Sequence, residues 1–163
     1  MPNPDSGASS RTTHVISAPR EAVYRAFVSV EALEQWQAPG DMTATVHHID
    51  LRPGGGYTMT LTYPPDTAGS PGKTIDREDR YTARFVELTP PSRIVEAIMF
   101  ETDDPAFTGE MTMTVDLAKI AGATEVTISF ANIPPGIRPE DNDTGTQLSL
   151  EKLARYVDGM AEG

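Results

Sequence analysis

The feature that most constrains the fold is a change in hydrophobic period near residue 43. From there to residue 130, large apolar side chains alternate with polar ones, which is the period of two typical of β-strands. The turns between these stretches are mostly of hairpin length, whereas a parallel crossover needs about a dozen residues or more. The sequence therefore predicts consecutive antiparallel strands over residues 43–51, 57–63, 74–88, 94–100, 110–117 and 124–130.

The chain before these strands predicts one more strand and two short helices. Residues 11–17 alternate as an edge strand, and Pro19 then opens a helix at a position where a missing N–H costs nothing. A second helix is expected over residues 30–36. Residues 1–10 hold almost no apolar side chain, so we expect a disordered tail there and a single domain over residues 11–163.

The last segment predicts a long helix from Pro139 to about Asp158, just before Gly159. One face of this helix is apolar toward the C-terminus and small and polar toward the N-terminus. A helix that only sealed a core would be apolar throughout, so we expect a gap between its polar half and the sheet. That face consists of Asn142, Thr146, Ser149, Leu150, Leu153, Ala154, Val157 and Met160.

Charge and composition disfavour several kinds of partner. The chain has 13 basic and 24 acidic residues, a net charge of −11, which repels nucleic acid and anionic lipid surfaces. It has no run of about 18 apolar residues for a membrane helix, no cysteine, and no secretion signal at its start. We therefore expect a cytoplasmic protein with no nucleic-acid partner and no membrane insertion.

Two motifs that suggest nucleotide or metal chemistry have simpler explanations. Gly54, Gly55 and Gly56 lead into a strand rather than a helix, so they predict a hairpin turn and not a phosphate loop. His47 and His48 are neighbours on a predicted strand, where successive side chains point to opposite faces, so they cannot share a metal ion. We predict no metal site and no cofactor.

Glu96 is a carboxylate for which the sequence allows two placements, on the inner or the outer face of its strand. It alternates with Ile94 and Ile98; on an interior face it would be paired or have a raised pKa. Val95, Ala97 and Met99 form an equally good inner face, and we favour an outward, solvated Glu96. No residue is assigned as catalytic, and Glu96 and His47 are the candidate acid or base if the protein is an enzyme.

Short motifs follow one another in a characteristic order along the chain. They are PREAVYRAF at 19–27, Trp36 with Pro39, RPGGGY at 52–57, ARFVEL at 83–88, PPSRIV at 90–95, GEMTMTVDL at 109–117, GATEV at 122–126 and LEKLARYV at 150–157. In this order and spacing they resemble the START-like, helix-grip superfamily. Within it they are similar to the branch of the C-terminal domain of the activator of the Hsp90 ATPase.

The resemblance implies an α+β fold in which a curved seven-stranded antiparallel sheet wraps around the long C-terminal helix. It also implies an elongated, mostly apolar cavity between sheet and helix. Many relatives have Gly-Trp early in the last helix, where this chain has Gly145 and Thr146. A threonine in place of an indole is expected to enlarge that end of the cavity.

The leading functional interpretation is a module that binds a small apolar or aromatic molecule in this cavity. One alternative is a polyketide cyclase, dehydratase or hydrolase-like enzyme. Another is a chaperone-interacting module, for which the sequence offers only Leu148 and diffuse acidity; a homodimer is left open. The predicted lining residues are Trp36, Tyr57, Met59, Tyr63, Phe85, Met111, Met113, Thr146, Ser149 and Leu150.

Overall fold

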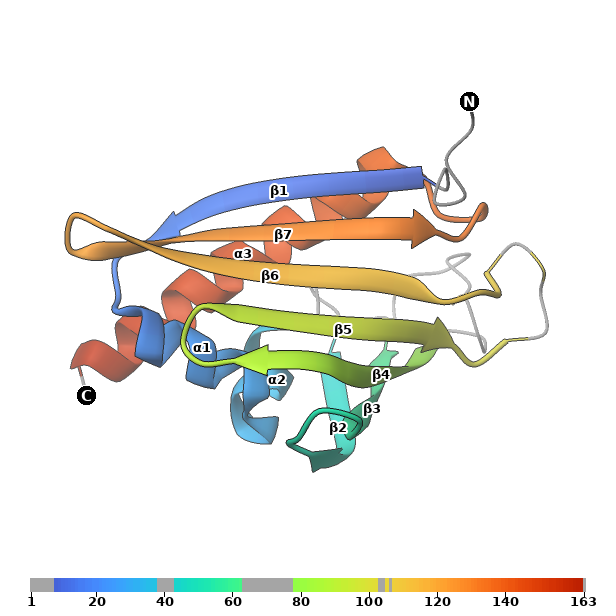
Figure 1. Cartoon of the computed structure of the whole chain (residues 1–163), viewed down its shortest axis with the longest axis horizontal. Coiled ribbons are helices and arrows are strands. Elements are labelled where there is room, and N and C mark those ends of the chain that lie inside the picture. The colour runs from blue at the N-terminus through green and yellow to red at the C-terminus, as the bar shows by residue number, and fades with distance from the viewer. Residues whose placement is uncertain (1–7, 38–42, 63–77, 103–104, 106, 163) are drawn as a thin grey trace.

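The structure is a computed structural model that describes residues 8–37, 43–62, 78–102, 105 and 107–162. Within these residues the chain forms one seven-stranded sheet and three helices (Figure 1). The helices are α1 (Arg20–Val28), α2 (Val30–Trp36) and α3 (Pro139–Glu162). The strands are β1 (Ala8–Ile16), β2 (Thr43–Asp50), β3 (Gly56–Thr62), β4 (Glu78–Thr89), β5 (Arg93–Phe100), β6 (Met111–Ile120) and β7 (Ala123–Ile133).

The sheet is antiparallel throughout, in the order β1-β7-β6-β5-β4-β3-β2. Strands that follow one another along the chain are therefore neighbours from β2 to β7, and β1 completes the edge beside β7. The sheet is bent, and α3 runs diagonally across its inner face behind β7 and β6 (Figure 1). The predicted α+β, helix-grip fold is confirmed.

The two short helices are locked together by one buried tryptophan. Pro19 precedes α1, as predicted, and the Ser29 hydroxyl accepts a hydrogen bond from the Ala32 backbone N–H, which caps α2. The indole N–H of Trp36 donates to the Ala26 carbonyl at 2.8 Å. The Trp36 ring also meets Phe27 edge to face, with ring centroids 4.7 Å apart. This contact holds the end of α2 against α1.

Several predicted boundaries differ from the structure. β6 ends at Ile120 rather than residue 117, and β7 ends at Ile133 rather than residue 130, because their strand pairing continues further. The strand start expected at residue 74 lies outside the described residues. β1 begins at Ala8 rather than residue 11, since its pairing with β7 continues to Ala8 opposite Ile133. α3 continues to Glu162, past Gly159, which we expected to end it. A single glycine costs a helix about 1 kcal/mol, which does not by itself end it.

The glycines between β2 and β3 form a tight turn, as predicted. Gly54 has a φ of 89°, a conformation that favours glycine. The Gly54 N–H donates to the Phe85 carbonyl, and the Phe85 N–H donates to the Gly55 carbonyl, each at 2.8 Å. A Cβ on Gly56 would collide with the Ala83 carbonyl oxygen. The glycines therefore allow close approach of this turn to β4, and no helix follows them.

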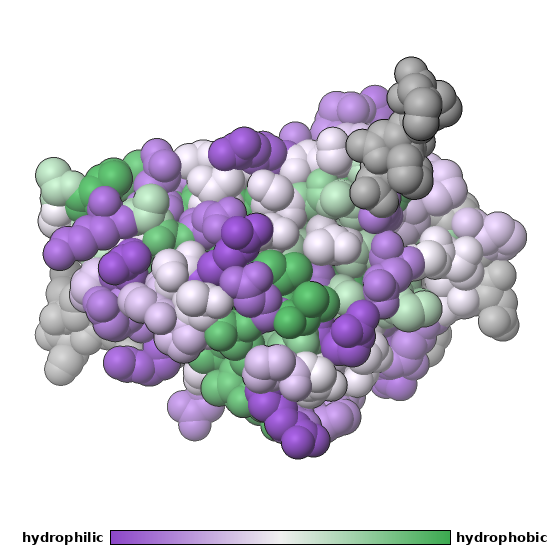
Figure 2. All heavy atoms as spheres, viewed as in Figure 1, coloured by the Kyte–Doolittle hydropathy of each residue, from purple (hydrophilic) through white to green (hydrophobic). Residues whose placement is uncertain are grey.

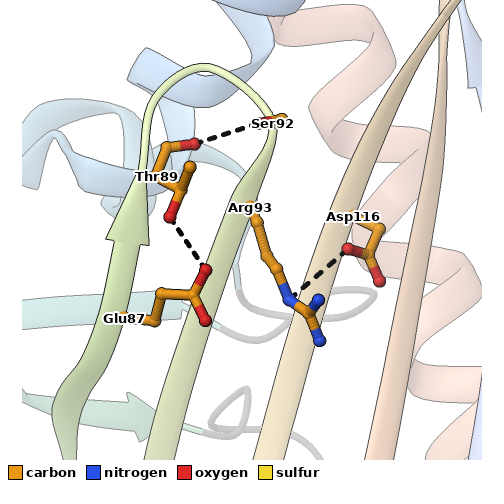
Figure 3. Close-up of polar contacts among 5 residues, drawn as sticks. All are labelled: Glu87, Thr89, Ser92, Arg93 and Asp116. Carbon is orange, nitrogen blue, oxygen red and sulfur yellow. Dashed lines mark hydrogen bonds and ion pairs between the residues drawn. The ribbon is translucent and has the colours of Figure 1, made fainter.

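The outer face of the sheet, opposite α3, has polar contacts near the turn between β4 and β5 (Figure 3). The Thr89 hydroxyl donates to Glu87 at 2.8 Å, and the Ser92 hydroxyl donates to the Thr89 carbonyl at 3.3 Å. Arg93 and Asp116 form an ion pair across β5 and β6 at 3.6 Å. Because these groups are solvent-exposed, they contribute little to stability.

None of the helices in the described ranges is long and apolar enough to span a bilayer.

Candidate functional site

A cavity of about 240 Å³ lies between the sheet and the N-terminal half of α3. Its helical wall is small and polar, and consists of Asp141, Asn142, Gly145, Thr146 and Ser149. Much of the remaining wall is aromatic, from Phe27, Trp36, Tyr81, Phe100 and Phe130. The hollow thus lies beside the part of α3 whose face is small and polar in the sequence.

The structure distributes the predicted lining residues over the wall and the core behind it. The cavity wall includes Trp36, Met111, Met113, Thr146 and Ser149. Four others are buried in the core and do not line this cavity, namely Tyr57, Met59, Phe85 and Leu150. Tyr63 lies outside the described residues. A role of any of them in ligand binding stays a prediction.

The polar residues of the wall that the sequence analysis missed include Tyr81 and Gln37. Tyr81 shares its strand face with Ala83 and Phe85, all three buried, so the same alternation that selected Phe85 could have found it. Gln37 follows the last residue of α2, and its position depends on how that helix ends. No local pattern distinguishes it from a solvated glutamine.

Glu96 lies inside the protein, with only 1% of its surface exposed, so the favoured outward placement was wrong. The opposite phase of β5 faces outward instead, with Val95 half-buried and Met99 49% exposed. The reason is a partner on another strand: the Tyr57 hydroxyl donates to Glu96 Oε1 at 2.9 Å. A buried carboxyl group is tolerated when it is hydrogen-bonded, and the period of β5 alone does not reveal that partner.

Glu96 is the inner end of a chain of hydrogen-bonding side chains that reaches the cavity. The Tyr81 hydroxyl hydrogen-bonds with both Tyr57 and Gln37. The rings of Tyr57 and Tyr81 pack nearly edge to face, with centroids 6.4 Å apart. Because Tyr81 and Gln37 line the cavity and Glu96 does not, the chain leads from the cavity wall into the core.

Burial sets the protonation of this chain. It raises the pKa of Glu96 from the ordinary value of 4.5 to about 7, and the hydrogen bond from Tyr57 limits the rise. Burial also raises the pKa of Tyr57 and of Tyr81, and the nearby Glu96 carboxylate raises both further. Both tyrosines therefore stay neutral at physiological pH, while Glu96 gains or loses its proton near neutrality.

His47, the other candidate acid or base, lies away from the cavity. Its Nε2 is 2.8 Å from the Thr60 hydroxyl. Thr60 follows the inward-facing Met59 on β3, so its side chain is on the outer face of the sheet. His47 is itself exposed. Among the described residues there is no group of three or more His, Asp or Glu side chains that could hold a metal ion.

The fold is that of the helix-grip class, a bent antiparallel sheet with a long C-terminal helix across its inner face. Within that class, the chain belongs to the family described as Activator of Hsp90 ATPase homolog 1-like protein, whose model matches residues 17–158. A comparison with curated proteins found no match.

Solved structures from several bacteria are similar to the chain. One is a crystal structure of a protein from Chromobacterium violaceum that is 34% identical to this chain. The matched region covers 91% of this chain and 96% of that protein, with a TM-score of 0.79. A solution structure from Arthrobacter aurescens is 17% identical, covers 96% and 90%, and has a TM-score of 0.77. A protein from Aeromonas hydrophila, related by name to the same activator family, is 20% identical, covers 93% and 94%, and has a TM-score of 0.66. The last two show the shared fold.

The raised pKa of Glu96 predicts a pH-dependent stability. Between about pH 4.5 and pH 7 the folded protein retains the Glu96 proton and the unfolded chain loses it, so the free energy of unfolding falls as the pH rises. The total fall from this group is roughly 3 kcal/mol. Glu96→Gln has no proton to lose, so the variant is expected to lack this fall and to be more stable than the wild type at pH 8.

Urea unfolding at pH 5 and pH 8 measures this difference. Glu87→Gln, at an exposed position of the neighbouring strand, is the matched control and should keep the wild-type dependence. A Glu96→Gln variant with the same pH dependence as the wild type would show that Glu96 ionises normally.

Proposed function

We propose that the protein binds a small apolar or aromatic molecule in the cavity between the sheet and α3. The observation that carries this proposal is the composition of the wall, in which aromatic and aliphatic side chains surround a few polar groups. Burial of apolar ligand surface supplies most of the free energy of binding in such sites, and the polar groups fix the orientation. The cavity is small, which favours a compact ligand.

The helical wall supports the proposal because its side chains leave the space open. The Thr146 hydroxyl donates back to the Asn142 carbonyl at 2.7 Å, and Gly145 has no side chain. The Ser149 hydroxyl donates to the Gln37 carbonyl at 2.8 Å and so ties α3 to the end of α2. These contacts use the Thr146 and Ser149 hydroxyl protons within the protein, so neither hydroxyl has to lose a hydrogen bond when an apolar ligand enters.

An enzyme of the cyclase, dehydratase or hydrolase type is a weaker proposal. It would require Glu96 or His47 to act on a molecule in the cavity. Glu96 does not line the cavity, and His47 is on the outer face of the sheet. We also propose that the protein acts in the cytoplasm, where disulfides are rare, because the chain has no cysteine and so needs none.

Ligand binding in the cavity can be tested by filling the cavity with a larger side chain. Thr146→Trp puts an indole into the space, so we expect the affinity for the neutral fluorescent probe N-phenyl-1-naphthylamine to fall about tenfold or more. Thr144→Trp is the matched control, because Thr144 is exposed on the same helix and does not line the cavity. Melting temperatures of both variants should stay near that of the wild type. Equal probe binding by the two variants, or none by the wild type, would contradict the proposal.

A chaperone-interacting module is the second candidate, and an apolar patch on the outer face of the sheet favours it. The patch consists of Val86, Val95 and Met99 on β4 and β5, with Val86 47% exposed. Figure 2 shows apolar side chains gathered in the middle of this face. Patches of this kind on soluble domains are typical of interaction sites.

This candidate predicts that Met99→Glu weakens binding to a purified Hsp90-type chaperone, measured by calorimetry, while Thr146→Trp leaves that binding unchanged. A wild-type protein that does not bind the chaperone would remove the candidate. Loss of chaperone binding in Thr146→Trp alone would instead link the interaction to the cavity.

A further inference from the structure

The charge of the cavity wall limits what the cavity can hold. Among the described residues that line it there is one carboxylate, Asp141, and no lysine, arginine or histidine. Glu96 lies behind the wall and also carries a negative charge when ionised. A carboxylate ligand would therefore lose its hydration without gaining a cationic partner. The wall suits an uncharged ligand.

The hydrogen-bond chain behind the wall has two possible directions. When Glu96 is ionised it can only accept, so Tyr57 donates to Glu96, as the structure has it. The one hydroxyl proton of Tyr57 is then used, so the hydrogen bond between the two tyrosines must take its proton from Tyr81. Each tyrosine has a single hydroxyl proton. In this state the proton of Tyr81 points into the core, and its oxygen accepts from the Gln37 amide. The wall then offers no tyrosine donor to a ligand.

Protonation of Glu96 allows this chain to run in the opposite direction, because the carboxyl group then has a proton to donate. The new carboxyl proton is donated to the Tyr57 oxygen, and the Tyr57 proton turns to the Tyr81 oxygen. The Tyr81 proton is then free to point toward the cavity, where the side-chain carbonyl of Gln37 or a ligand oxygen can accept it. A wall that donates a hydrogen bond to a ligand is therefore possible when this buried carboxyl group is protonated.

We propose that the cavity binds an uncharged molecule that carries a carbonyl group, whose oxygen accepts a hydrogen bond from Tyr81. In this proposal Tyr81 contacts the ligand, and Glu96 and Tyr57 are positioning residues that direct the Tyr81 proton. The proposal rests on the cavity being a ligand site and specifies the chemical class of the ligand. It also requires that carbonyl binding strengthens as Glu96 takes up its proton.

The groups around Glu96 leave its proton as the controlling one near neutral pH. Among the described residues, the titratable partners of Glu96 are Tyr57 on β3 and Tyr81 on β4, and both remain neutral in this range. On β6 the residue paired with Glu96 is Met113, which carries no charge. α3 brings Asp141 to the cavity, at an exposed position. Carbonyl affinity is therefore expected to fall as the pH rises through about 7.

The experiment compares acetophenone with α-methylstyrene, which has the same shape but replaces the carbonyl oxygen by a methylene group. Trp36 is the one tryptophan of the chain and lines the cavity, so its indole N–H signal in a ¹H–¹⁵N spectrum reports occupancy. We expect acetophenone to bind the wild type about fivefold more tightly at pH 5.5 than at pH 8.5, the effect of about one hydrogen bond. α-Methylstyrene should bind equally at both pH values.

Three variants separate this role from a structural one. Tyr81→Phe should lose the preference for acetophenone at both pH values. Glu96→Gln, whose amide donates to Tyr57 at any pH, should bind acetophenone tightly at both. Tyr24→Phe is the control, because Tyr24 is a buried tyrosine of α1 that does not line the cavity, and it should behave as the wild type. The dispersion of each spectrum verifies that the variant is folded.

The outcomes distinguish this inference from the proposed function. Equal binding of acetophenone and α-methylstyrene at both pH values would overturn the carbonyl inference and leave the ligand cavity standing. Tighter binding of benzoate than of acetophenone would also overturn it. If neither compound shifts the indole signal although N-phenyl-1-naphthylamine binds, the inference fails alone; if no probe binds, the proposed function fails with it.

Discussion

The hydrogen bond from Tyr57 to Glu96 is the interaction on which the interior of this protein depends. A carboxyl group at the centre of a sheet is costly to bury, and it is retained only if it is hydrogen-bonded or protonated. Here both conditions operate, because Tyr57 donates to Glu96 and burial raises the pKa of Glu96 to about 7. The pair fixes which face of β5 is interior. It also connects the core to the cavity through Tyr81.

The two halves of α3 differ in polarity and make different contacts. Its C-terminal half seals the core through Leu150, Leu153 and Val157, all buried. Its N-terminal half is held to β1 by hydrogen bonds from Thr12 to Asp143 and from Asn142 to Ser10. These polar contacts fix the helix without filling the space beneath it. A cavity and a stable helix position are thus compatible.

Much of the fold could be predicted because its determinants are local. The period of two over residues 43–130 specified the strands, and their short connections specified antiparallel pairing. Pro19 marked the start of α1, and the bounds of α2 were predicted correctly. Gly54–Gly56 could be assigned to a turn because a strand follows them. The predicted end of α3 was wrong, since a single glycine such as Gly159 does not by itself end a helix.

The candidate site was predictable only in part because its determinants are not local. The small polar face of α3 is written in the sequence, and it indicated a hollow at Thr146 and Ser149. The inward position of Glu96 depends on Tyr57, which is 39 residues away along the chain. Gln37 and Tyr81 meet only when α2 and β4 are in place. Alternation on β5 fitted both faces equally, so the hydrogen-bond partner decided the outcome.

The most direct test of the central claim is the ionisation of Glu96 itself. A ¹³C spectrum of the glutamate side-chain carboxyl groups, recorded across pH 4 to 9, follows each carboxyl separately, and the spectrum of Glu96→Gln identifies the Glu96 signal. The account predicts a midpoint near pH 7, well above the exposed glutamates. A midpoint near 4.5 would contradict it, because Glu96 would then be an ordinary ionised carboxylate.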